Sequence, residues 1–319
     1  MAASGGTKAV VAALAANLTI AVFKFIAWLV TLSSSMLAEA IHSVADSGNQ
    51  VLLLIGGKRA QRQASPQHPF GYGRERYVYS FIVAIILFSL GGLFALYEAY
   101  QKFLHPHGIE GRWWWVPLAV LVGAIIAEGL SFRTAIKESN PLRGKQSWLS
   151  FIRRAKAPEL PVILLEDFGA LLGLVFALFG VSLTLITGNG VYDALGTAMI
   201  GLLLVSIAIV LAAETKSLLL GESATKEHVR LIEGALVAGG GRIIHLKTLH
   251  LGPDELLVAA KMSVEPGASG EQIAEAIDAA EVRVRDAVPI ARLIYIEPDI
   301  YRAPVAAAAP EGTPAGGGA

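Results

Sequence analysis

The chain has no cysteine and few charged residues. Without cysteine it can form no disulfide, no thiolate metal site and no cysteine nucleophile, so any metal ion must be held by nitrogen and oxygen. Only 16% of the 319 residues are charged and 54% are hydrophobic, which is too apolar for an ordinary soluble domain. The 26 basic and 26 acidic side chains cancel, so no excess charge points to nucleic acid. We therefore expect a membrane protein with no nucleic-acid partner.

Long apolar runs predict a membrane domain with six transmembrane helices. A bilayer core about 30 Å thick needs about 20 apolar residues per helix. The runs of suitable length are 9–31, 36–57, 78–100, 114–135, 160–186 and 190–214. The first run is longer than a signal-peptide core, so we interpret it as a retained helix. Backbone groups in lipid must bond internally, which makes helices the expected form of all these runs.

Basic residues are concentrated in the loops after the second and fourth runs. The opposite side has only Lys102 and Arg112, so the positive-inside rule places both termini in the cytoplasm. Trp113, Trp114 and Trp115 stand where the fourth helix should enter the interface, as an aromatic anchor does. The frequent alanine, glycine and arginine suggest a bacterium with a GC-rich genome, so we expect a multi-pass protein of the cell membrane.

A cytoplasmic domain is expected at 216–302, after a membrane domain at 1–215. Helices are expected at 226–238 and 272–288, and strands at 243–250, 255–264 and 292–297. In this α-β-β-α-β order, two helices would cover one face of a three-stranded sheet. The other face or an edge would be left for a partner, so we expect a homodimer. Residues 303–319, rich in Ala, Pro and Gly, are expected to be disordered.

Ionisable residues inside the second apolar run indicate a binding site. Each such group costs ~2.5 to 3.5 kcal/mol at membrane depth, so it persists where it faces the bundle interior, pairs or binds a ligand. The polar residues of this run are Glu39, His42, Asp46, Asn49 and Gln50. His42 and Asp46 are one helical turn apart and share a face, so they can grip one small cation.

The fifth apolar run adds two adjacent acids, Glu166 and Asp167. Neighbouring residues differ by about 100° around a helix, so both cannot point straight at one site, and we expect Asp167 to face inward. His42, Asp46 and Asp167 would then supply three ligands to tetrahedral zinc, with the fourth from Glu166, Asn49 or water. The same donors suit manganese, iron or cobalt.

Lys24 leaves other arrangements open. His42 and Asp46 could instead pair with each other, or with Lys24, as a structural link between helices. Glu128 of the fourth run has two interpretations of equal weight: a salt link to Lys24, or a proton relay or supporting carboxylate beside the metal site.

Two acids lie near the ends of the runs. Glu98 is expected close to the membrane interface, solvated or paired with Lys102. Asp193, at the start of the sixth run, is expected to cap the N-terminus of its own helix.

In order along the chain, several motifs resemble the cation diffusion facilitator family of metal/proton antiporters. The motifs are EAIHSVADSGNQ (39–50), HPFGYGR (68–74), LLEDFGALLG (164–173) and GNGVYDALGTAMIG (188–201). The resemblance runs from about residue 8 to 301, and is greatest to the branch of mitochondrial-type zinc transporters, whose fifth helix carries the Glu-Asp pair. It implies an all-α bundle of six transmembrane helices followed by a cytoplasmic α+β ferredoxin-like domain.

The resemblance also implies a transport site made by two residues four apart on the second helix and two on the fifth. His42, Asp46 and Asp167 fall on three of these positions. The fourth is Ile163, which cannot ligate. Glu166 could replace it, or could carry the exchanged proton.

Other metal sites of the family are not expected in this chain. In the loop motif His68 is present, but Tyr72 stands at the second histidine position and Ser65 lies near the acidic one. In the soluble domain, Ala259 and Tyr295 occupy positions at which some members place ligands. We expect neither a loop site nor a regulatory metal cluster.

The function that the resemblance implies is export of a divalent metal ion, with zinc as the expected cargo, in exchange for protons by alternating access. Because metal ligands bind when deprotonated, the proton-coupling candidates are His42, Glu166 and Glu128. No cofactor is expected. The alternative is a transport-inactive metal-binding or sensing protein of the same fold. An enzyme is not expected, since no nucleophile stands beside a base and no phosphate-binding loop is present.

Overall fold

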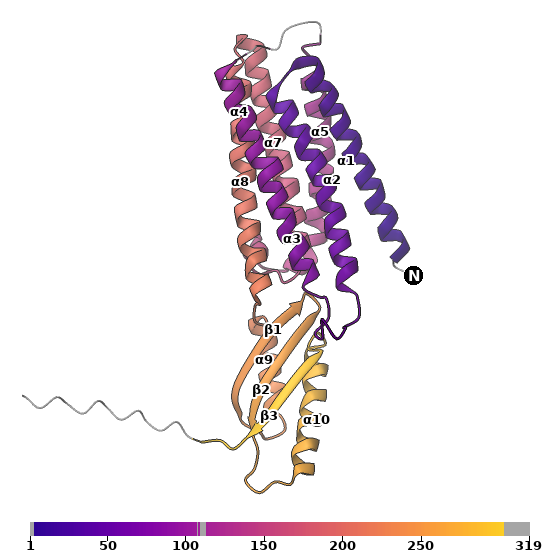
Figure 1. The fold of residues 1–319 in the computed structure, drawn as a ribbon, viewed down its shortest axis with the longest axis vertical. Helices are drawn as coiled ribbons and strands as arrows, with labels where there is room; N and C mark the ends of the chain where they lie inside the picture. The colour runs from indigo at the N-terminus through magenta and orange to yellow at the C-terminus, as the bar shows by residue number, and fades with distance from the viewer. Residues whose placement is uncertain (1–2, 107, 109–112, 303–319) are drawn as a thin grey trace, which may run out of the picture. The chain divides into compact units, whose positions relative to one another are not determined.

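The computed structural model describes the backbone of residues 3–106, 108 and 113–302, and their side chains from Asn17 onward. The expected tail at 303–319 and the predicted outer residue Arg112 lie outside the described residues. The chain divides into a helical unit, residues 1–222 with 250–254, and a second unit, residues 223–249 with 255–319 (Figure 1).

The helical unit contains one long helix for each predicted apolar run. Its elements are α1 (Ala3–Thr31), α2 (Ser34–Ala60), α3 (Glu75–Ile86), η1 (Leu87–Leu93), α4 (Phe94–Leu104), α5 (Val116–Arg143), α6 (Trp148–Arg154), α7 (Glu159–Thr187) and α8 (Val191–Leu220). The third run corresponds to the continuous helix α3-η1-α4, and α6 is a short helix in the loop before α7. Within that continuous helix η1 is a π-helical segment, a feature that the apolar pattern did not predict.

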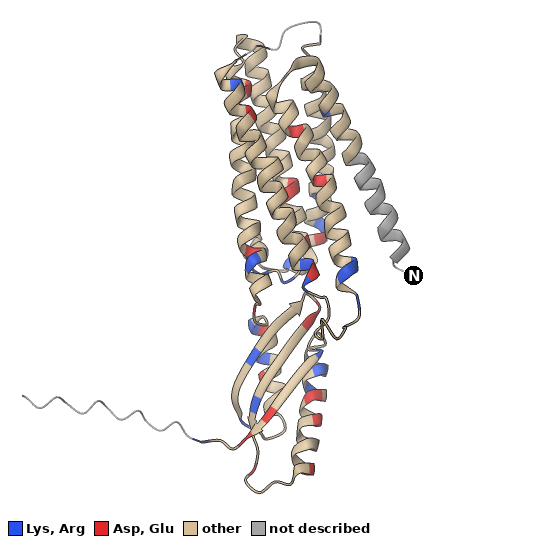
Figure 2. Ribbon diagram, viewed as in Figure 1, with Lys and Arg blue, Asp and Glu red and all other residues tan. Residues whose placement is uncertain are grey.

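Four helices of the described chain are long and apolar enough to cross a membrane: Glu75–Leu104, α5, α7 and α8. The segment Asn17–Thr31 of α1 is apolar but shorter. Helix α2 has 27 residues, which is long enough, yet its middle carries acidic and imidazole side chains and it falls below the same threshold of apolarity. In Figure 2, Lys and Arg gather at the end of the helical unit where α2 ends and α3 begins.

The polar helix α2 is tolerated because other helices surround it. It packs against α1, α3, η1, α7 and α8, so its polar side chains are buried in protein. Apolar side chains from the surrounding helices form the core of the unit; they include Leu87, Leu121, Leu174, Ile200 and Leu204. The core therefore separates the polar face of α2 from the outer surface.

The second unit has the predicted α-β-β-α-β order. Its elements are α9 (Lys226–Val237), β1 (Ile243–Gly252), β2 (Glu255–Ser263), α10 (Gly270–Ala287) and β3 (Leu293–Asp299). The strand order is β1-β2-β3, and β2 and β3 run parallel with Leu257 opposite Leu293. Alternate residues of β2, beginning at Leu256, are buried and share a core with Ile232 of α9 and Val284 of α10.

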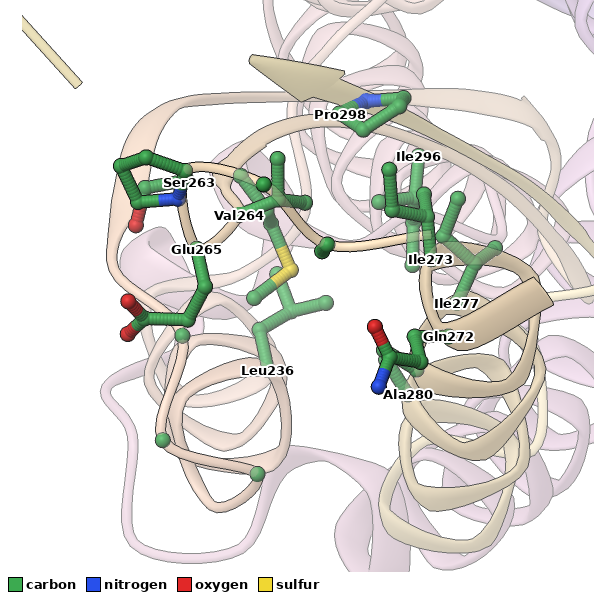
Figure 3. A pocket seen from close by; sticks show the side chains of 18 of the residues that line it. Leu236, Ser263, Val264, Glu265, Gln272, Ile273, Ile277, Ala280, Ile296 and Pro298 are labelled. Atoms are coloured by element: carbon green, nitrogen blue, oxygen red, sulfur yellow. The ribbon is translucent and has the colours of Figure 1, made fainter. Parts of the chain in front are cut away.

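A cavity of about 650 Å³ lies in the second unit, between the end of α9, the start of α10 and the ends of β2 and β3. Leu236 of α9 faces Gln272 and Ile277 of α10 across it (Figure 3). A run of glycines, Gly239–Gly241, borders its rim.

Candidate metal site

The face of α2 that carries His42 and Asp46 is buried at the centre of the helical unit. Their exposed fractions are 1% and 7%, and Glu39 and Asn49 on the same helix are fully buried. His42 Nε2 lies 3.4 Å from Asp46 Oδ2, but neither ring nitrogen of His42, nor Oδ1 of Asp46, has a hydrogen-bond partner. Buried polar atoms without partners are uncommon in proteins and call for an explanation.

The separation between these two side chains is compatible both with a direct His-Asp pair and with two ligands of one zinc ion. Ligand atoms that are each about 2.0 to 2.1 Å from a tetrahedral zinc ion lie about 3.3 Å apart. The 3.4 Å between His42 Nε2 and Asp46 Oδ2 is close to this distance between two zinc ligands. It is long for a hydrogen bond. The pair on α2 therefore has the spacing of two ligands of one small cation.

The two adjacent acids of α7 point to different neighbours, and both are buried. Glu166 Oε1 accepts a 2.6 Å hydrogen bond from Asn49 Nδ2 of α2, and its carboxyl group interacts directly with that of Asp46. Asp167 Oδ2 instead accepts a 3.0 Å hydrogen bond from Ser131 of α5. Both acids are buried in the bundle, so burial does not single out Asp167 as the inward one, and its role as a ligand stays a prediction.

The predicted ligands thus meet only in part. Asp46 of α2 lies beside His42 on its own helix and beside Glu166 of α7, whereas Asp167 is turned towards α5. Among the described residues, no three His, Asp or Glu side chains converge closely enough to form a ready metal site. Ile163 is partly buried against the apolar core, which leaves its position without a ligand.

Lys24 of α1 is fully buried and belongs to a separate polar link. Its Nζ donates to Glu39 Oε2 at 3.0 Å and to Ser43 Oγ at 2.7 Å. A side chain at Gly173 of α7 would come within 2.7 Å of Glu39 Oε1, so this glycine makes room for the carboxylate. Lys24 forms its ion pair with Glu39, and not with His42, Asp46 or Glu128 as the sequence-based alternatives had it.

Glu128 of α5 is 7% exposed and takes no part in the Lys24 pair. It lies close enough to Lys24 to interact with its charge, and also to Asp46, Glu166 and Asp167. Both sequence-based interpretations of Glu128 therefore stay predictions.

Asp193 differs from its expected role. Helix α8 has no side-chain cap at its N-terminus; Asp193 is fully buried and accepts hydrogen bonds from Ser33, Ser34 and Ser35 at the start of α2. It therefore caps a helix far from it in sequence. Three successive serines before an apolar run are the one sequence signal that could have indicated a buried acceptor at this place.

The remaining candidates form local contacts. The ring of His68 packs edge-on against Tyr72 with centroids 4.6 Å apart, and the Tyr72 hydroxyl lies 3.1 Å from Ser65 Oγ, as in a tight turn. Glu98 is half-buried near Lys102, whose Nζ donates to the backbone oxygen of Leu32 at 3.2 Å.

Comparison with known proteins gives matches over most of the chain. The family model of the cation efflux transmembrane domain matches residues 10–220. The chain is 36% identical over 228 residues to the proton-coupled zinc antiporter SLC30A9, mitochondrial, of Homo sapiens, which covers 71% of this chain and 40% of that protein. It is 31% identical over 221 residues to metal tolerance protein C4 of Arabidopsis thaliana, covering 68% of this chain and 47% of that protein.

A shorter match links the chain to a bacterial protein. It is 31% identical over 130 residues to zinc transporter ZitB of Pectobacterium atrosepticum, covering 40% of this chain and 39% of that protein. The chain spans less than half the length of each of these relatives. Because the family model matches most of the chain and includes α2 and α7, the resemblance seen in the motifs is confirmed, and this multi-pass membrane protein belongs to the cation efflux family.

Proposed function

We propose that this protein exports zinc from the cytoplasm across the cell membrane in exchange for protons. The observation that carries the proposal is the buried pair of His42 and Asp46 on α2. It has zinc-ligand spacing, both His42 ring nitrogens and Asp46 Oδ1 lack hydrogen-bond partners, and Asp46 lies beside Glu166 of α7. The printed names of relatives, a proton-coupled zinc antiporter and a zinc transporter, support the same cargo and coupling ion.

The proposed site consists of His42, Asp46 and Glu166, with Asp167 as a fourth ligand after its side chain leaves Ser131. Asn49 donates to Glu166 and orients it, so in this conformation it acts as a positioning residue and not as a ligand. Manganese, iron and cobalt suit the same donors. The proposal includes neither a cofactor nor a chemical conversion, so the proposed role is that of a transporter and not of an enzyme.

Proton exchange follows from the ligands themselves. A carboxylate or imidazole binds a metal ion only when it is deprotonated, so loading from the cytoplasm releases protons and unloading takes them up. His42 and Glu166 are the groups that exchange protons with the ion. Glu128, near both carboxylates of the site, is the candidate for passing protons onward.

The membrane arrangement is also part of the proposal. Helices α1 and α2 join the four apolar spans to make six, with both termini in the cytoplasm, because the buried face of α2 allows a polar helix to cross inside the bundle. The second unit is proposed to be a ferredoxin-like cytoplasmic domain that supports a homodimer, since its sheet has helices on one face.

Zinc flux in proteoliposomes with an imposed pH gradient tests the proposal. Flux should require the gradient and should be lost in Asp46→Ala and Glu166→Gln, with both variants still folded by their thermal unfolding. Ser206→Ala, at an exposed position of α8, is the control. Stoichiometric zinc binding without flux in the parent protein would instead support the transport-inactive alternative.

A further inference from the structure

The start of α2 is bound to α8 through one buried carboxylate. Asp193 Oδ1 accepts from Ser33 Oγ at 3.0 Å, Ser35 N at 3.4 Å and Ser35 Oγ at 2.5 Å, and Oδ2 accepts from Ser34 N at 2.8 Å. Hydrogen bonds to an ionised acceptor are stronger than neutral ones, and a helix N-terminus favours negative charge. All four groups are buried, so water does not compete for these bonds in this conformation.

A lysine from a third helix closes the same region. Lys102 of α4 is 5% exposed, donates to the backbone oxygen of Leu32 at 3.2 Å, and lies near enough to Asp193 to interact with its charge. Leu32, in the turn between α1 and α2, has φ of 55°. This left-handed conformation is unfavourable for leucine and persists only where surrounding contacts hold it.

The backbones of α7 and α8 touch at this level. A side-chain carbon at Gly196 would come within 2.8 Å of the Phe176 backbone oxygen, and one at Gly180 within 2.8 Å of the Tyr192 backbone oxygen. The same carbon at Gly196 would lie 3.5 Å from Ser35 Oγ. Helices α7 and α8 are therefore in close backbone contact here, and Ser35 at the start of α2 packs against the same part of α8.

We propose that Asp193, Ser33–Ser35 and Lys102 form a polar latch that closes the outer end of the ion path. The inference rests on the proposed function, because it needs an ion that passes between α2 and α7. An ion bound at His42 and Asp46 can leave on this side only if the start of α2 separates from α8. That separation breaks the four bonds to Asp193 and releases the strained Leu32. Outer water can then solvate the freed groups, so the latch has a closed and an open state.

Thiol labelling tests the latch directly, because the chain has no cysteine of its own. Ala38→Cys places one thiol on α2 between Ser35 and His42, at helical spacings that share a face, and Ala38 is only 4% exposed. A membrane-impermeant thiol reagent is applied to vesicles from the latch side, and the labelling rate is measured. Asn189→Cys, in the exposed turn before α8, reports which vesicles present this side.

Asp193→Asn is expected to raise the labelling rate of Ala38→Cys by about tenfold or more, because charge-assisted hydrogen bonds are lost. Ser35→Ala should raise the labelling rate less, because it removes only one side-chain donor. This variant serves as the test if Asp193→Asn fails to fold. Ser206→Ala, at an exposed position of α8, should leave the labelling rate unchanged.

Equal labelling rates in Asp193→Asn, Ser35→Ala and the parent would overturn the latch. Zinc flux is measured in the same vesicles, so the two proposals can fail separately. Faster labelling in Asp193→Asn, with no zinc flux in the parent, would refute zinc transport; the contacts would then close this end of the bundle without gating zinc. Zinc flux in the parent with unchanged labelling in both variants would refute the latch and keep transport.

Discussion

Asn49 of α2 donates a 2.6 Å hydrogen bond to Glu166 of α7, and so holds that carboxylate beside Asp46. A hydrogen bond to a charged group is worth about 1.5 to 3 kcal/mol. Since about 1.4 kcal/mol corresponds to a tenfold change in affinity, the loss of this bond in Asn49→Leu should raise the zinc concentration for half-maximal flux by about tenfold or more. Gln50→Leu, at the next and less buried position, is the control and should change it little. An unchanged Asn49→Leu would mean that Glu166 is not a ligand.

Ile163 provides a test of whether Asp167 joins the site. It lies one turn before Asp167, so histidine there would share a helical face with the carboxylate. If Asp167 leaves Ser131 when zinc binds, Ile163→His should tighten zinc binding by about tenfold, or about 1.4 kcal/mol, as measured by titration calorimetry. Ile163→Leu controls for repacking of the core and should bind as the parent does. No gain in Ile163→His would leave Glu166 as the only ligand from α7.

The Lys24–Glu39 pair should matter for stability more than for zinc affinity. Both side chains are fully buried, and removing one partner of a buried ion pair leaves an uncompensated charge at a cost of about 3 to 5 kcal/mol. Lys24→Met is expected to lower the thermal midpoint strongly in detergent. The double variant Lys24→Met with Glu39→Gln should recover most of the loss, because no charge is then left unpaired. A double variant as unstable as the single one would show that the pair is not the cause.

Glu222, after the end of α8, carries an ion pair with Lys156 outside the membrane-spanning helices. Burial alone would raise the pKa of Glu222, but hydrogen bonds from Lys156 and Ser217, with the charge of Lys156, lower it overall. Its stabilising effect is therefore complete above the unfolded pKa of about 4.3 and is lost as the pH falls through the lower folded value.

In Lys156→Met the pKa shift of Glu222 should change from a lowering to a raising. Burial would then dominate and raise the pKa of Glu222, so this group would favour the folded state more as the pH falls from 7 towards about 4.3. Thermal midpoints across this range, compared with the exposed control Lys145→Met, measure the change of slope. Parallel pH profiles in the two variants would contradict the assignment.

Several features were predictable because they depend on residue order alone. The apolar runs predicted the long helices, since lipid-compatible length and hydropathy are local properties. The spacing of His42 and Asp46 predicted a shared face, since helical periodicity is local as well. The strand predicted at 255–264 is also present as β2, and alternate residues along it are buried.

The direction of each polar side chain in the bundle was decided only by the tertiary structure. Glu166 and Asp167 are adjacent in sequence, yet one faces α2 and the other α5, because α7 packs between these helices. Lys24 forms its ion pair with Glu39 and not with Glu128, and Asp193 caps α2 and not its own helix. The amino-acid sequence thus determined which polar groups enter the membrane domain and their spacing along each helix. Packing between helices determined the partners of these groups. Burying a polar group without a hydrogen bond is costly, so each group pairs with the donor or acceptor that the fold places beside it.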